Sequence, residues 1–128
     1  MLQWQQSLAG SAFDHATSVE QMPDSTYIVA GFSLSSDGDV TGSHGSFEYW
    51  ILKLSTTGAI IWEKSLGGSG ADGAYPYCVD IHRTTDAGYI VSGQSNSNDG
   101  DVSGNHGSYD YWVAKLDCGF DEIGRAHV

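Results

Sequence analysis

The feature that most constrains the fold of this chain is an internal duplication. The segments Tyr27–Leu54 and Tyr89–Leu116 are identical at 18 of 28 aligned positions. Each begins and ends with a short run rich in β-branched and aromatic residues, and the two runs enclose a stretch rich in glycine and aspartate. Such runs are typical of strands, and the stretch between them is typical of a turn-rich loop. We therefore predict a repeat protein in which the same strand-rich unit is built twice.

Shorter matches extend the repeat beyond these segments. Gln3–Leu8 (QWQQSL) matches Ile61–Leu66 (IWEKSL), and Ala16–Gln21 matches Cys78–Arg83, with four extra residues near 73–77 that predict a longer loop. Each unit then contains four short strands with a period near 60 residues. Four strands per repeat at this period favour an all-β fold with antiparallel four-stranded blades. We interpret the chain as an incomplete β-propeller of about two blades.

The repeat also predicts a division of the chain. Residues 1–12 are expected to hold the last strand of a preceding blade, residues 13–66 the first repeat, residues 67–117 a second, incomplete repeat, and residues 118–128 a tail outside the repeat. Within this tail, residues 122–128 (EIGRAHV) look like a translated sequencing adapter. We therefore expect a piece of a longer protein. Its uncovered apolar faces should pack on further blades of the parent chain or on a second copy.

Charge and hydropathy narrow the range of partners. Five basic and sixteen acidic residues give a net charge of −11, which argues against nucleic acid and anionic membranes. No apolar run is long enough to span a bilayer, and the first twenty residues do not resemble a signal peptide. Cys78 and Cys118 occupy non-equivalent positions of the repeat, so we expect free thiols rather than a disulfide.

The loop inside each duplicated segment carries the spacing of an EF-hand calcium loop. Both copies place acids at positions 1, 3 and 12, a hydroxyl at position 5 and a glycine at position 6. Calcium prefers six to eight hard oxygen ligands, which alternating short acids can supply. The loops lie between predicted strands rather than helices, so this calcium would be structural. The candidate ligands are Asp37, Asp39, Thr41, Ser43 and Glu48 in the first copy and Asp99, Asp101, Ser103, Asn105 and Asp110 in the second.

A second interpretation of these loops stays open at this point. Aspartates in a glycine-rich loop also accept hydrogen bonds from nearby backbone amides and then need no metal. His44 and His106 recur at one loop position and are expected to serve the blade rather than a reaction. If calcium does bind, the shorter side chain of Asp110 predicts a weaker second site than Glu48 gives the first.

The motifs in their order along the chain resemble a known repeat. A YIV strand, a DGDVSGNHG loop, a DYWV strand, a KLD turn and a W-K-LGG stretch resemble the repeat of large secreted or cell-surface bacterial β-propeller proteins, which often carry a type IX secretion sorting tail. The resemblance implies a β-propeller fold and an extracellular or cell-surface location, and it implies no agreed activity. The first copy departs from the pattern at Ser25, Thr26 and Glu48.

The sequence favours a role without catalysis. It contains no GxSxG, HExxH, GxxxxGK or CxxC motif. We therefore expect a binding or scaffolding module whose partner is an unknown protein or glycan. One alternative is a glycan-binding propeller completed by self-association, with Tyr75 and Tyr77 in the longer loop as ligand contacts. Another is a non-catalytic part of a larger extracellular enzyme. The recurring tryptophans and tyrosines are expected to pack between blades.

Overall fold

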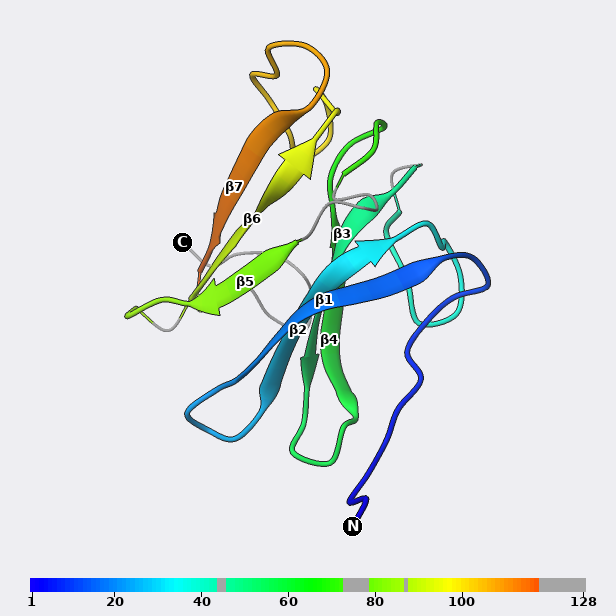
Figure 1. The fold of residues 1–128 in the computed structure, drawn as a ribbon, viewed down its shortest axis with the longest axis vertical. Coiled ribbons are helices and arrows are strands. Elements are labelled where there is room, and N and C mark those ends of the chain that lie inside the picture. Colours follow the sequence, from blue (N-terminus) through cyan, green and yellow to red (C-terminus); the bar gives the residue numbers. More distant parts are fainter. Residues whose placement is uncertain (44–45, 73–78, 87, 118–128) are drawn as a thin grey trace.

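A computed structural model describes residues 1–43, 46–72, 79–86 and 88–117 of the chain. The described residues form seven β-strands and no helix (Figure 1), so none of them forms a helix that could cross a membrane. The prediction of an all-β fold is confirmed. Several residues named above lie outside the described ranges, namely His44, Tyr75, Tyr77, Cys78, Cys118 and the tail 118–128. The strands are β1 (Asp14–Gln21), β2 (Tyr27–Ser33), β3 (Glu48–Leu54), β4 (Ile60–Leu66), β5 (Asp80–Arg83), β6 (Tyr89–Ser95) and β7 (Asp110–Leu116).

The strands form two antiparallel sheets in which neighbours along the chain are neighbours in space. The first sheet has the order β1-β2-β3-β4 and the second the order β5-β6-β7. The two sheets use the same register, since Gly31 lies opposite Trp50 in the first and Gly93 lies opposite Trp112 in the second. The first repeat has the four strands that the repeat predicts, and the described part of the second repeat has three.

The strand predicted for residues 1–12, the expected last strand of a preceding blade, is absent from the described structure. Gln3–Leu8 matches β4 in sequence, but it forms no strand in the structure. A strand needs an edge to pair with, and in the described chain this segment lies against a sheet face instead. Its Trp4 and Leu8 side chains pack on the first sheet beside Trp50 and Leu52. The prediction of a strand in this segment was therefore wrong for the described structure.

The two sheets pack face to face and share the larger apolar core. Ile28, Phe32 and Ile51 of the first sheet are buried in one cluster with Tyr89 and Val91 of the second. The ring of Tyr49 stacks on that of Trp112 with 5.1 Å between centroids, and the Tyr49 hydroxyl donates to the Gln94 carbonyl at 2.7 Å. Alternation of inward and outward side chains along each strand produces this face. The predicted packing of recurring aromatics between the sheets is seen here.

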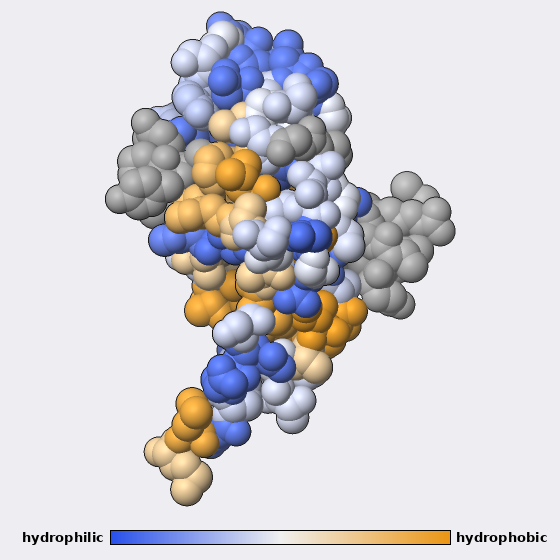
Figure 2. All heavy atoms as spheres, turned by 90° about the vertical axis from the view of Figure 1, so that its right-hand side faces the viewer, coloured by the Kyte–Doolittle hydropathy of each residue, from blue (hydrophilic) through white to orange (hydrophobic). Residues whose placement is uncertain are grey.

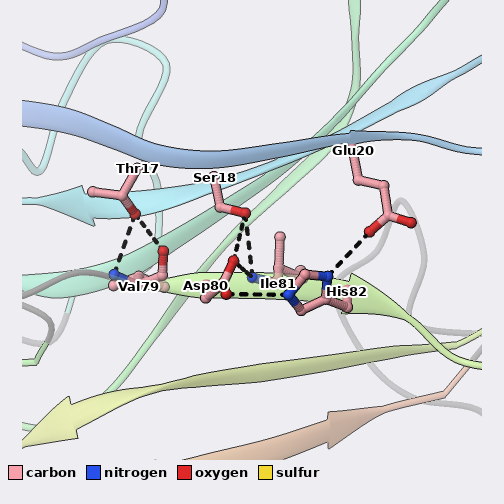
Figure 3. Close-up of polar contacts among 7 residues, drawn as sticks. All are labelled: Thr17, Ser18, Glu20, Val79, Asp80, Ile81 and His82. Carbon is pink, nitrogen blue, oxygen red and sulfur yellow. Dashed lines mark hydrogen bonds and ion pairs between the residues drawn. The ribbon is translucent and has the colours of Figure 1, made fainter.

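β1 and β5 are equivalent strands of the two repeats, and they lie close to each other where the sheets meet (Figure 3). The Thr17 hydroxyl bonds both the carbonyl and the amide of Val79, with 3.2 Å between Thr17 Oγ1 and the Val79 nitrogen. The Ser18 hydroxyl donates to Asp80 at 2.9 Å. These side chains join the two sheets at their first strands without a continuous backbone ladder.

The opposite face of the first sheet carries a second apolar cluster. Val40, Trp50, Leu52 and Leu54 are buried there, with Trp4 packed against them. Figure 2 views the molecule from the right-hand side of Figure 1 and shows hydrophobic residues gathered at the surface of its middle and lower parts. Both faces of the first sheet are therefore apolar, as expected for a sheet placed between neighbouring layers.

Candidate functional site: the repeated acidic loops

Both acidic loops begin with the same backbone shape. Gly38 and Gly42 have φ angles of 63° and 73°, and their counterparts Gly100 and Gly104 have 62° and 76°. A side chain at Gly38 would also meet the Ala9 carbonyl oxygen at 2.6 Å. Glycine is therefore required at this position both for the left-handed conformation and for the close approach of another backbone. The loop follows β2 and lies against the segment that leads into β1.

The acids of the first loop bind that leading segment. Asp37 accepts hydrogen bonds from the Ser11 amide at 2.8 Å and the Ser11 hydroxyl at 2.7 Å. Asp39 accepts from the Ala9 amide at 2.9 Å, while its own amide donates to the Ala9 carbonyl at 2.9 Å. The two acids thus hold a connection that lies 26 and 30 residues away along the chain.

The second loop repeats this arrangement bond for bond. Asp99 accepts from the Ser69 amide and hydroxyl, each at 2.8 Å. Asp101 accepts from the Gly67 amide at 2.9 Å and donates its own amide to the Gly67 carbonyl at 2.8 Å. Residues 67–71 connect β4 of the first sheet to the second repeat. We call this set of bonds from an acidic loop to the connection before its repeat the loop clamp.

A buried aspartate completes each clamp. Asp72 is fully buried and accepts from the Ser95 and Ser97 hydroxyls and the Gly68 amide, the last at 3.0 Å. In the first repeat, Asp14 binds the equivalent donors of Ser33, Ser35 and Gly10. The sequence analysis assigned neither aspartate a role. The Ser-x-Ser pair that follows each YIV strand was the signal that could have revealed it.

A second residue missed by sequence reasoning is Glu63 of β4. Its carboxylate accepts from the Thr41 amide and hydroxyl, and from the Trp50 ring nitrogen at 2.8 Å. The Ser65 hydroxyl donates to the Thr41 carbonyl at 2.8 Å. The far end of the first loop is therefore held by the fourth strand of its own sheet. In the second repeat, Ser103 takes the position of Thr41, and the described chain holds no fourth strand beside it.

The remaining predicted ligands lie apart from the clamps. Glu48 is buried at the start of β3. Its counterpart Asp110 accepts from the amide of His106 at 2.8 Å and from its ring at 3.0 Å. Asn105 bonds the carbonyls of Ser95 and Ser108 with its amide nitrogen. Ser43 lies half-buried within the first loop.

The predicted calcium ligands do not converge in the described structure. Asp37 and Asp39 point at amide and hydroxyl hydrogens of the leading segment, whereas Thr41 faces Glu63. The described residues contain no group of three or more His, Cys, Asp or Glu side chains placed to hold a metal. The carboxylate oxygens of Asp37 and Asp39 direct lone pairs at these N–H and O–H hydrogens rather than at one shared central point. Calcium binding at these loops stays a prediction.

Burial and hydrogen bonding shift the pKa values of the acids in opposite directions. Burial raises the pKa of Asp72 above its usual value, and the nearby Glu48 carboxylate adds to the rise. The amide and hydroxyl of Ser11 lower the pKa of Asp37. The amide and ring of His106 lower that of Asp110 in the same way. Burial also raises the pKa of the Tyr49 hydroxyl.

No protein-family model matches the chain, and no curated protein matches it. The resemblance to secreted bacterial β-propellers therefore stays an expectation drawn from the sequence motifs.

Proposed function

We propose that the chain is a section of a β-propeller and serves as a non-enzymatic binding or scaffolding module of a secreted or cell-surface protein. In this proposal the acidic loops are clamps that set the position of one blade relative to the next. The module would bind a protein or glycan partner through its loops and sheet edges. It would catalyse no reaction.

The observation that carries this proposal is the loop clamp, which occurs in both repeats with the same donors and acceptors. Each clamp binds the connection that leads into its repeat, as Asp37 binds Ser11 and Asp99 binds Ser69. A bond network kept in two copies at the same structural position supports a role that every repeat needs. A site that binds one specific ligand would need only one copy.

The packing of the two sheets also supports the proposal. Propeller blades stack face to face with their first strands innermost, so that equivalent strands of neighbouring blades lie side by side. β1 and β5 are such equivalent strands, and Thr17 and Ser18 of β1 bond residues 79 and 80 at β5. Residues from opposite faces of the repeat meet at this interface, as Tyr49 meets Trp112.

A chain with one more repeat tests the proposal. In this chain, a second copy of residues 55–117 is joined to Leu116 and replaces residues 117–128. The added copy of β4 then supplies a fourth strand to the second sheet, and the added copies of β5, β6 and β7 form a third sheet. The added sheet should cover the outer face of β6 and β7, and we expect a single unfolding transition at a higher melting temperature than that of the original chain.

The matched control carries lysine at the added copies of Val91 and Trp112, the positions that pack between sheets. This control should lose the gain in melting temperature. An added repeat that unfolds in a separate transition, or that leaves the melting temperature unchanged, would show that the repeats do not stack as blades.

A further inference from the structure

We propose that residues 2–8 of one copy of this chain pair with β7 of a second copy as the fourth strand of its three-stranded sheet. Repetition of this contact would join copies head to tail. The inference rests on the proposed blade architecture and adds to it a specific partner, a donor segment and a register.

The first support is that the N-terminal segment already occupies the position of a β4-type strand. Trp62 of β4 packs edge-on against Tyr89 of the next repeat, with 6.4 Å between ring centroids and 65° between ring planes. Trp4 packs against Tyr27 in the same way, at 5.8 Å and 65°. Trp4 therefore contacts the first tyrosine of the first repeat in the way that Trp62 contacts the equivalent tyrosine of the second.

The second support is the edge of the second sheet. In the described chain, β7 has β6 on one side and no strand on the other, whereas the equivalent β3 pairs with β4. A hollow lies beside this edge, lined by Ser103, Asn105, His106 and Trp112 among others. The counterparts of Ser103 and Trp112 in the first repeat are Thr41 and Trp50, which bind Glu63 of β4. A sheet edge with no neighbouring strand in the described chain favours the addition of one.

The third support is the apolar face beside the same edge. Val113 is 60 % exposed, while its counterpart Ile51 is fully buried by the second sheet. In a head-to-tail pair, the Val113 face of one copy would meet the Trp50 face of the next, as the Ile51 face meets the Trp112 face within one copy. Trp4 would keep its place on Tyr27 of its own copy. The N-terminal segment thus needs no displacement to pair with β7.

The register follows from that of the complete sheet. Leu66 lies opposite Tyr49, Lys64 opposite Ile51 and Trp62 opposite Lys53. Transferred to the second copy, this register places Leu8 opposite Tyr111, Gln6 opposite Val113 and Trp4 opposite Lys115. Gln5 then takes the place of Glu63, and its side-chain carbonyl can accept from the Trp112 ring nitrogen. Such a contact uses different surfaces on the two copies and so extends into an open chain or closes into a ring.

Cysteine pairing across the two copies tests the register directly. One population of the full chain carries Gln6→Cys and the other carries Val113→Cys, both in a Cys78→Ser, Cys118→Ser background. Oxidation of the mixture, or treatment with a short bis-maleimide, should give a crosslinked heterodimer. The matched control replaces Gln6→Cys by Gln5→Cys, whose side chain points to the other face of the strand. We expect at least about tenfold less crosslink with the control, because the two thiols lie on opposite faces.

Sedimentation velocity of the unmodified chain provides the second measurement. We expect the average mass to rise with concentration and to return to that of a monomer when an excess of the peptide LQWQQSL, the sequence of residues 2–8, occupies the β7 edge. Val113→Lys should weaken the association, whereas Val19→Lys, at a β1 position that is 65 % exposed, should leave it unchanged. A chain that stays monomeric at all concentrations would overturn the inference.

Equal crosslinking of Gln6→Cys and Gln5→Cys would also overturn it. The crosslinking result can be told apart from the result of the three-repeat chain, which tests the proposed function. If the three-repeat chain gains stability while no crosslink forms, strand donation between copies fails and the blade architecture stands. If the three-repeat chain gains none, the blade architecture itself fails.

Discussion

Tyr49 and Tyr111 occupy the same position in the two repeats, yet Tyr49 is fully buried and Tyr111 is 96 % exposed. The second sheet covers Tyr49, and no described part of the chain covers Tyr111. The same residue type in the same local structure therefore has two environments, and the difference arises only from what packs on each sheet. This difference makes the repeat its own control for several measurements.

Replacement of each tyrosine by alanine should separate these environments. Tyr49→Ala removes a buried ring that stacks on Trp112, so we expect a loss of about 3–5 kcal/mol in the free energy of unfolding. Tyr111→Ala removes an exposed ring and should change it by about 0.5 kcal/mol or less. Urea unfolding of both variants at a concentration where the chain is monomeric checks this. Equal losses would contradict the observed sheet packing.

The buried aspartate of the second clamp should matter more than its partly exposed counterpart in the first. Asp72→Ala leaves the Ser95 and Ser97 hydroxyls and the Gly68 amide without their acceptor, and we expect a loss of about 2–4 kcal/mol. Asp14→Ala removes the equivalent bonds where water can replace them, so its loss should be smaller. Urea unfolding ranks the two variants, and a larger loss for Asp14→Ala would count against the proposed clamp.

The raised pKa of Asp72 predicts a specific dependence of stability on pH. The folded state holds the Asp72 proton more tightly than the unfolded state does, where the pKa is near 3.8. The stability that this proton contributes is fully present below that value and is lost as pH rises through the folded pKa. The wild type should therefore lose stability relative to Asp72→Asn as pH rises from about 3 to about 7. Paired urea titrations measure this difference, and a difference that stays constant with pH would refute the assignment.

The effect of calcium separates the two interpretations of the acidic loops. Asp37 and Asp39 already accept hydrogen bonds from the leading segment, so if these bonds are their whole role the melting temperature should be the same in excess calcium and in excess chelator. Magnesium at the same concentration controls for ionic strength. A calcium-specific rise of several degrees, lost in an Asp99→Asn variant, would instead establish the metal site that the loop spacing predicts.

The contacts between the first strands of the two sheets give a further matched pair. Thr17→Val keeps the shape of the side chain but removes the hydroxyl that bonds both backbone groups of the buried Val79. We expect a loss of about 1–3 kcal/mol, since a buried amide and a carbonyl lose a partner. Ser18→Ala removes an exposed bond to Asp80 and a 3.4 Å bond from the Ile81 amide, which Asp80 also accepts at 3.1 Å, so it should cost only about 0.5 kcal/mol. Similar losses for both would show that Thr17 does not join the sheets.

Strand positions could be predicted well because their causes are local. The runs that begin and end the duplicated segments Tyr27–Leu54 and Tyr89–Leu116 form the strands β2, β3, β6 and β7. Runs of β-branched and aromatic residues between glycine-rich turns favour strands wherever they occur. Gln3–Leu8 shows the limit of this reasoning, since its strand-like sequence lies on a sheet face and pairs with no edge.

The candidate site was predicted only in part. The acids of the two loops do form a repeated polar site in which carboxylates accept from backbone amides and hydroxyls, while the cation that their spacing predicts stays a prediction. The donors for Asp37 lie 26 residues away, and Glu63 reaches Thr41 across 22 residues. Loop spacing carries no information on partners so distant in the chain. Asp14 and Asp72 were missed for the same reason.

The sequence by itself determined the repeated unit, its strands and the turns between them, because those follow from side-chain shape, alternation and glycine positions within a few residues. Only the tertiary structure decided which sheet face is buried and which donors each carboxylate binds. Those outcomes depend on how the second sheet packs on the first, and two nearly identical segments therefore acquire a buried Tyr49 and an exposed Tyr111.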